Sequence, residues 1–292
     1  MAEDAYRVIC GGDTGYRDYV WMKKFRGKLG FTNVEFIDQS EQLATLGLWG
    51  PEARSTLQKL MDDPDSVSGE AFPYTMTREI DVLGVKVWAF RISYVGEQGW
   101  ELYFPFADGL KLWDALAELG VTPVGIETYA NSRRLEKSLR LQNADLETDY
   151  NLYEAGLARP KVKAADFHGK AAHLAHREEQ PSAILCTMTL DDLNVSGKGS
   201  RYPVGISPII DPATGEVPID SKGRRSYSTS MSYCPSIKKH VVMGYLPKEI
   251  AIPGKSLSLH YFNEKGDGIY PMTVQIIGKG SLYDPNNERV RS

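Results

Sequence analysis

Hydrophobic and polar residues alternate most regularly over residues 80–90, where Gly84 interrupts the pattern. A period of two broken by a glycine is typical of two strands joined by a tight turn. Shorter apolar runs at 6–10, 34–37 and 43–48 also predict strands. The first half of the chain is therefore expected to contain a sheet.

Four further segments show apolar residues at helical spacing. Residues 16–29 predict a helix that ends before Gly30, and a second helix is expected to begin after Pro51. A third helix is expected to begin near residue 108, and a fourth is expected over residues 128–141. The charged side chains of 128–141 are interpreted as a solvated helical face. Strands and helices in alternation indicate a mixed α/β layer.

The pattern changes near Gln180 and Pro181. Helical spacing stops there, and short β-rich runs at 183–190, 239–243, 256–262 and 272–277 alternate with turn-forming residues. Such runs predict a small antiparallel barrel or sandwich. The fold class is therefore α+β, with one unit at 1–178 and a second at 179–292.

Composition narrows the class of protein. The chain has 292 residues, 34 basic and 38 acidic side chains and a formal net charge of −4, which excludes a polycationic surface for nucleic acid. Its three cysteines match neither a disulfide framework nor a zinc knuckle, which favours a reducing compartment. The acidic start and the lack of a long apolar run argue against a signal peptide and a membrane span. We expect a cytoplasmic protein.

Residues 91–104 carry the most informative chemistry. They read as a strand that breaks into a glycine-flanked turn and then resumes, with Tyr94 and Glu101 on either side. A carboxylate beside an aromatic ring can accept two parallel hydrogen bonds from the 2-amino-4-oxo edge of a pterin. The segment is therefore a candidate folate site. Glu97 and Trp100 compete for these roles, and the plainer alternative makes Glu101 an ordinary half-exposed strand residue.

Other catalytic classes find little support. His168, His173 and His176 have no neighbouring cysteine or suitably spaced carboxylate to complete a metal site, so they are interpreted as solvent-facing helix residues. No metal is predicted. The sequence contains no Gly-x-Ser-x-Gly element and no dinucleotide-binding Gly-x-Gly-x-x-Gly after a strand. Neither a serine hydrolase nor a nicotinamide or flavin protein is indicated.

Three blocks in a shared order resemble the glycine cleavage T-protein (aminomethyltransferase) family, and especially the folate-binding C-terminal half of dimethylglycine and sarcosine dehydrogenases. The blocks are RISYVGEQGWELY at 91–103; YANSRRLEK at 129–137 with EAGL at 154–157 and DFHGK at 166–170; and STSMSYCPSIKK at 228–239 with VMGY at 242–245 and LYDP at 282–285. Together they span nearly the whole chain.

The resemblance implies a fold and a cofactor. It implies a mixed α/β folate-binding region followed by a small antiparallel β-barrel, with tetrahydrofolate as the bound cofactor. It places the pterin-edge glutamate of the family at Glu101 and the pocket tyrosine at Tyr94. Trp100 remains a candidate for flanking the pterin ring.

The contact with the folate tail departs from the family pattern. Glycine-cleavage members place an arginine before an aspartate in the second block, but Ala130 and Asn131 stand there in this chain. Tyr129 and Arg133 are therefore the substitute candidates for the tail. No catalytic residue is assigned.

The resemblance also implies that the catalytic aspartate of the family lies in a segment before residue 1, because Asp13 has a different context. Without an oriented proton acceptor, a pterin pocket gives binding but no turnover. The strand predicted at 6–10 would also leave its edge hydrogen bonds unpaired. A second protein subunit is therefore expected to complete the N-terminal half of the cavity.

The sequence thus predicts a tetrahydrofolate-dependent aminomethyl- or methyltransferase in a demethylase or glycine-cleavage-like complex. Its small-molecule partners would be folate and a methylated amine or another one-carbon donor. The alternative is a non-catalytic folate-binding or assembly subunit. A third hypothesis treats the β-rich end as an interaction module.

Overall fold

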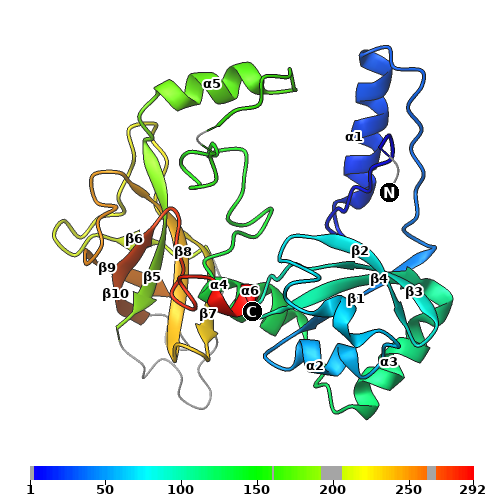
Figure 1. Cartoon of the computed structure of the whole chain (residues 1–292). Coiled ribbons are helices and arrows are strands. Elements are labelled where there is room, and N and C mark those ends of the chain that lie inside the picture. The colour runs from blue at the N-terminus through cyan, green and yellow to red at the C-terminus, as the bar shows by residue number, and fades with distance from the viewer. Residues whose placement is uncertain (1–2, 160, 192–205, 262–267) are drawn as a thin grey trace.

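The computed structural model describes residues 3–159, 161–191, 206–261 and 268–292, and its strands form two antiparallel sheets (Figure 1). The first sheet has the strand order β1-β4-β3-β2. Its strands are β1 (Leu43–Trp49), β2 (Thr77–Val82), β3 (Val85–Phe90) and β4 (Gly99–Pro105). The strand predicted at 43–48 and the hairpin at 80–90 are confirmed, whereas residues 91–98 form no strand.

Alternation along β4 decides which side of this sheet is buried. Trp100, Leu102 and Phe104 point into the core, and intervening Glu101 and Tyr103 lie half-buried on the opposite face. The helices α2 (Ala53–Gln58) and α3 (Gly109–Glu118) contribute Leu57, Leu112 and Leu116 to the same core. Each fully buried apolar side chain stabilises the fold by about 1.5 to 3 kcal/mol. The packed core holds β4 in place and leaves Glu101 and Tyr103 on the opposite face of the sheet.

The second sheet has the strand order β6-β9-β10-β5-β8-β7 and is strongly curved (Figure 1). Backbone hydrogen bonds from Ile209 N to Ser226 O, 3.2 Å, and from Ser228 N to Ser207 O, 2.9 Å, join its two ends. Its strands are β5 (Ala183–Leu190), β6 (Ile209–Ile210), β7 (Ser228–Cys234), β8 (Lys239–Pro247), β9 (Ser256–Tyr261) and β10 (Gly268–Ile277). Residue 262 of the run predicted at 256–262 lies outside the described residues. The boundary between 178 and 179 stays a prediction.

The N-terminal region departs from the predicted sheet. The helix expected at 16–29 is present as α1 (Gly15–Lys28), but residues 6–10 and 34–37 form no strand. A strand needs a neighbour for its backbone hydrogen bonds, and neither sheet pairs with these segments. No side chain of α1 is buried. Of the helices in the described ranges, none is long and apolar enough to cross a bilayer.

The helix predicted at 128–141 is much shorter and is not solvated. A π-helical segment, η3 (Glu127–Arg133), runs into α4 (Arg134–Glu136), and the chain then turns at Ser138, whose φ is 52°. Arg134, Glu136 and Lys137 are buried, which corrects the interpretation of a solvated face. Arg134 is buried because its Nη1 lies 2.5 Å from the carboxylate of Asp145. The remaining helical elements are η1 (Pro64–Val67), η2 (Phe106–Asp108), α5 (Lys170–Glu178) and α6 (Glu288–Arg291).

Arg224 ties a turn of the second sheet to the loop before Glu154. Its Nη2 lies 2.5 Å from Glu154 Oε1 and 2.6 Å from Asp220 Oδ2. Burial raises the pKa of both carboxyl groups, but hydrogen bonds lower each pKa by more. Glu154 accepts hydrogen bonds from the Arg224 side chain and the Asn151 amide. Asp220 accepts them from the Arg224 side chain and from the amides of Arg224 and Lys222. Both pKa values therefore lie below their usual 4.5 and 3.8.

We expect this cluster to make stability depend on acid pH. Because both pKa values are lowered in the folded state, the stabilisation is complete above about pH 5 and is lost as the pH falls through the folded-state values. Denaturant unfolding between pH 7 and pH 3 should show a steeper fall in unfolding free energy for the native chain than for Arg224→Met. Equal slopes for the two proteins would contradict the assignment.

Candidate functional site

Glu101 is an acidic residue on the outer face of the first sheet, the face opposite Trp100. The hydroxyl of Tyr103, two residues along β4, donates a hydrogen bond to Oε2 of Glu101. Gly47 of β1 is the backbone partner of Glu101 across the strands. Within the described ranges no lysine, arginine or histidine forms an ion pair with Glu101. Its carboxylate therefore keeps acceptor capacity for a ligand.

Aromatic rings that contact one another lie on the same side of the sheet, and one of them, Tyr129, is close enough to Glu101 to interact with its charge. The rings of Trp49 and Tyr129 stack with centroids 5.4 Å apart and an interplanar angle of 18°. Tyr129 also contacts Tyr94, with centroids 5.3 Å apart. A Cβ atom at position 47 would lie 2.1 Å from the indole of Trp49, so glycine there lets the ring lie across β1. We call Trp49, Tyr94, Glu101, Tyr103 and Tyr129 the aromatic face.

Hydrogen bonds fix two of these rings. Nε1 of Trp49 donates to the carbonyl of Ile92 at 2.8 Å, and the hydroxyl of Tyr94 donates to the carbonyl of Arg140 at 3.0 Å. These contacts join strand β1, the 91–98 segment and the chain after α4. The aromatic face is thus preorganised by three separate parts of the sequence, which reduces the entropy cost of ligand binding.

The tyrosines of the aromatic face stay protonated at neutral pH. Burial raises the pKa of Tyr94 to about 12. Burial, together with the charge of Glu101, raises the pKa of Tyr129, and burial with the hydrogen bond to Glu101 raises the pKa of Tyr103. These phenols therefore act as aromatic surfaces and hydrogen-bond donors, and they are poor general bases near pH 7.

The structure separates Trp100 from the other candidate site residues. Trp100 is fully buried in the core beneath the sheet, where its ring lies 6.1 Å from that of Phe72. The guanidinium of Arg91 lies 5.8 Å from the Trp100 ring. Because neighbouring strand residues point to opposite faces, Trp100 cannot share a cavity with Glu101. Its contribution is to the packing that holds β4.

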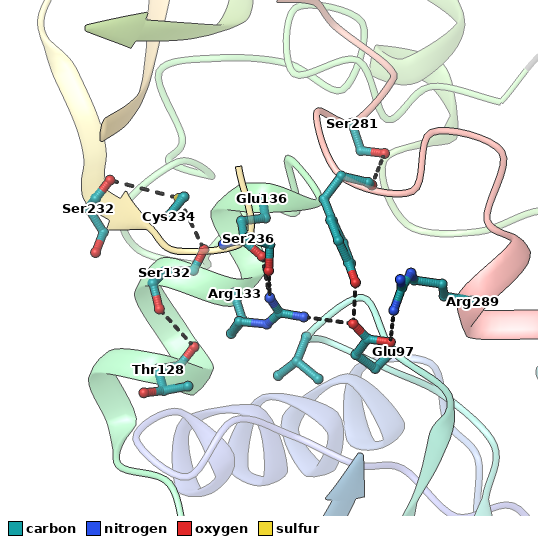
Figure 2. A network of polar contacts seen from close by, with 12 residues as sticks. Glu97, Thr128, Ser132, Arg133, Glu136, Ser232, Cys234, Ser236, Ser281 and Arg289 are labelled. Carbon is teal, nitrogen blue, oxygen red and sulfur yellow. Dashed lines mark hydrogen bonds and ion pairs between the residues drawn. The ribbon is translucent and has the colours of Figure 1, made fainter. Parts of the chain in front are cut away.

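Arg133 and Glu97 are bound to each other instead of facing the aromatic face. Nη2 of Arg133 lies 3.0 Å from Oε1 of Glu97, and Nη1 lies 2.6 Å from Oε2 of Glu136 (Figure 2). Both carboxylates are already neutralised, so Glu97 is not a vacant acceptor for a pterin. Arg133 remains a proposed contact for the folate tail, but its guanidinium has protein partners already.

The three histidines do not form a metal centre. The ring of His168 contacts those of Trp21 and Phe25, and His173 stacks on Tyr153. In the part of the chain that the structure describes, no group of three or more histidine, cysteine, aspartate or glutamate residues is placed to hold a metal ion.

Trp49 and Tyr103 belong to the aromatic face, although neither is among the site residues predicted from the sequence. Tyr103 had a readable signal, because residues two apart on a strand share a face and Tyr103 follows Glu101 by two. Trp49 had none, since its place depends on the pairing of β1 with β4, about fifty residues apart.

Comparison with known proteins gives a consistent result. The family model for the GCVT N-terminal domain matches residues 1–163. Human mitochondrial dimethylglycine dehydrogenase is 30% identical over 277 residues, which cover 92% of this chain and 29% of the relative. An aminomethyltransferase from Symbiobacterium thermophilum is 29% identical over 254 residues, covering 85% of this chain and 63% of the relative. This chain therefore spans less than two thirds of either relative.

A solved structure supports the fold. The glycine cleavage system aminomethyltransferase T from Bartonella henselae superposes with a TM-score of 0.69 at 21% identity, over 90% of this chain and 65% of that one. At this level of identity the likeness establishes the shared architecture of helices and sheets and leaves function to the site.

Proposed function

Because the chain belongs to the glycine cleavage T-protein family, we propose that it is a tetrahydrofolate-dependent one-carbon transferase. The observation that carries the proposal is the half-buried Glu101 carboxylate, which has no ion-pair partner in the described ranges and shares one side of the sheet with the stacked rings of Trp49 and Tyr129. A pterin offers two parallel N–H donors on a flat ring system, and these residues are complementary to both features.

Each residue of the aromatic face has a role in this proposal. Glu101 accepts the hydrogen bonds of the amino-oxo edge, and the hydroxyl of Tyr103 fixes the rotamer of Glu101. Trp49, Tyr94 and Tyr129 limit where the bicycle lies and exclude water from it. Tetrahydrofolate, when bound, supplies the amine that accepts the one-carbon unit.

We further propose that this chain works in a complex, with a methylated amine or a protein-bound aminomethyl group as donor. Support comes from the large apolar side chains of the N-terminal region that remain exposed in the described parts of the chain. They are Tyr6, Val8, Ile9, Tyr16, Val20, Trp21, Leu29, Phe31, Val34 and Ile37. A second subunit that covers them would complete the cavity. Three free cysteines favour a reducing compartment such as the cytoplasm.

A turnover assay tests the proposal. The purified chain, alone and with its candidate partner subunit, is mixed with tetrahydrofolate and a donor such as dimethylglycine with an oxidising flavoenzyme. We expect the complex to raise the rate of methylenetetrahydrofolate formation, followed by chromatography, above that of the flavoenzyme alone. Folate binding without any rate increase would favour the alternative of a non-catalytic folate-binding subunit. Absence of both would contradict the proposal.

A further inference from the structure

Glu97 is the centre of a polar cluster that joins distant segments. The residue is 8% exposed, and its Oε1 accepts hydrogen bonds from Arg133 Nη2 at 3.0 Å and from the hydroxyl of Tyr283. Nη1 of Arg289 lies 3.4 Å from the other carboxylate oxygen. Figure 2 shows Arg133 and Arg289 on opposite sides of the Glu97 carboxylate. A buried acid is thus neutralised by cations from two separate segments.

Tyr283 completes the cluster from the C-terminal side. Its ring lies 5.0 Å from the guanidinium carbon of Arg133 and 5.3 Å from that of Arg289. Its backbone N–H donates to the carbonyl of Glu136 at 3.0 Å. Cation–π contacts of this kind are strongest where water is excluded. We call Glu97, Arg133 and Tyr283 the clasp.

The position of the clasp in the sequence connects it to the aromatic face. Glu97 follows Tyr94 by three residues in the same irregular segment, and Arg133 follows Tyr129 by four in η3. The Glu97–Arg133 ion pair therefore joins the same two segments that carry the contacting rings of Tyr94 and Tyr129. If the ion pair were broken, the distance between the two rings would no longer be fixed, because each segment is short.

We propose that the clasp is a positioning device for the aromatic face, and that docking of residues 281–289 is thermodynamically coupled to ligand binding there. The inference rests on the proposed function for the identity of the ligand, a reduced folate. Tyr283 does not touch the aromatic face; it holds Glu97 and Arg133 in register, and these fix Tyr94 and Tyr129. Coupling of this kind is reciprocal, so a folate that favours the ordered face must also favour docking of 281–289.

The proposal is tested with Tyr283→Phe, which removes one hydroxyl and keeps the ring. Tetrahydrofolate affinity, measured by calorimetry, is expected to fall about 5- to 20-fold, within the usual range of coupling between sites. The matched control is Tyr153→Phe, which removes a half-buried hydroxyl that lies 3.5 Å from Nε2 of His173 on α5, outside the clasp and the aromatic face. The control is expected to lower stability and leave the affinity unchanged.

Hydrogen exchange distinguishes coupling from a purely structural contact, because only coupling makes exchange over 281–289 depend on bound tetrahydrofolate. Saturating tetrahydrofolate is expected to slow amide exchange over 281–289 in the native chain and to lose that effect in Tyr283→Phe. If Tyr283→Phe does not fold, Glu97→Gln is used, since it keeps the shape and weakens both arginine contacts. If the variant binds tetrahydrofolate with the native affinity and tetrahydrofolate still slows its exchange over 281–289, the proposal is wrong.

NMR of the ligand-free protein separates this inference from the proposed function. If the native chain takes up no folate, the proposed function fails, and the clasp is judged on the ligand-free protein. NMR signals of the Tyr94 and Tyr129 rings should then shift in Tyr283→Phe and remain in place in Tyr153→Phe. Unshifted rings would overturn the clasp whether or not folate binds.

Discussion

Replacing Glu101 by glutamine is expected to weaken tetrahydrofolate binding by about 1.5 to 3 kcal/mol, the scale of a hydrogen bond to a charged group. This corresponds to about a 10- to 150-fold rise in Kd. Glutamine keeps the shape of the side chain, but it loses the charge and turns an NH₂ group toward the N–H donors of the pterin. Calorimetric titration measures the change directly.

The matched control is Glu79→Gln on the same outer face. Glu79 pairs with Trp88 on β3, and Trp88 pairs with Tyr103 on β4, so the control removes an exposed acid two strands from Tyr103. Its Kd for tetrahydrofolate should stay within about twofold of the native value, because an exposed charge at that distance is largely screened. Equal effects of the two substitutions would remove Glu101 from the site.

Arg134→Met is expected to lower the free energy of unfolding by about 3 to 5 kcal/mol, the cost of leaving one partner of a buried ion pair alone. The side chains of Arg134 and Asp145 are 1% and 0% exposed. Arg134 also donates to the carbonyls of Ala130, at 2.6 Å, and Leu139, at 3.1 Å. Methionine fills much of the volume and satisfies none of these acceptors. Denaturant titration gives the value.

Lys86→Met serves as the control for Arg134→Met. Lys86 pairs with Asp81 at 3.2 Å, but the two side chains are 69% and 39% exposed. Surface pairs of this kind contribute about 0 to 1 kcal/mol. A loss for Arg134→Met no larger than that for Lys86→Met would show that the buried pair does not hold η3 and α4 in place.

The same arginine shows where sequence reasoning stopped. The sequence predicts that much of the charge of 128–141 is solvated, because Lys, Arg and Glu are rarely buried. Arg134 is buried because Asp145, which neutralises it, comes eleven residues later, after a turn that helical periodicity does not reveal. Charge patterning along one helix carries no information about partners outside it.

Strand prediction succeeded where pairing was local. The hairpin of β2 and β3 turns at Leu83 and Gly84, so alternation and a glycine were sufficient. Residues 6–10 and 34–37 also read as short apolar runs, yet neither sheet pairs with them. Strand formation depends on neighbours that a local apolar run does not specify.

For the candidate site, too, local patterns predict local features and not tertiary contacts. Alternation on β4 separates Glu101 from Trp100 and would also have selected Tyr103. The contacts of Tyr129 with Trp49 and Tyr94 arise from packing of η3 against the first sheet, which no sequence period encodes. Sequence reasoning could thus find the carboxylate, Tyr94 and Tyr129, and strand alternation could have found Tyr103. Only the tertiary fold shows Trp49 and the contacts among the rings.

A crystal structure of the chain with tetrahydrofolate, and with its partner subunit if uptake requires one, tests the central claim most directly. We expect the 2-amino group and N3 of the pterin to lie about 2.7 to 2.9 Å from the oxygens of Glu101, the distance of charge-assisted hydrogen bonds. The bicycle should lie against the rings of Trp49 and Tyr129. Folate bound elsewhere, with the Glu101 carboxylate turned to solvent, would contradict the claim.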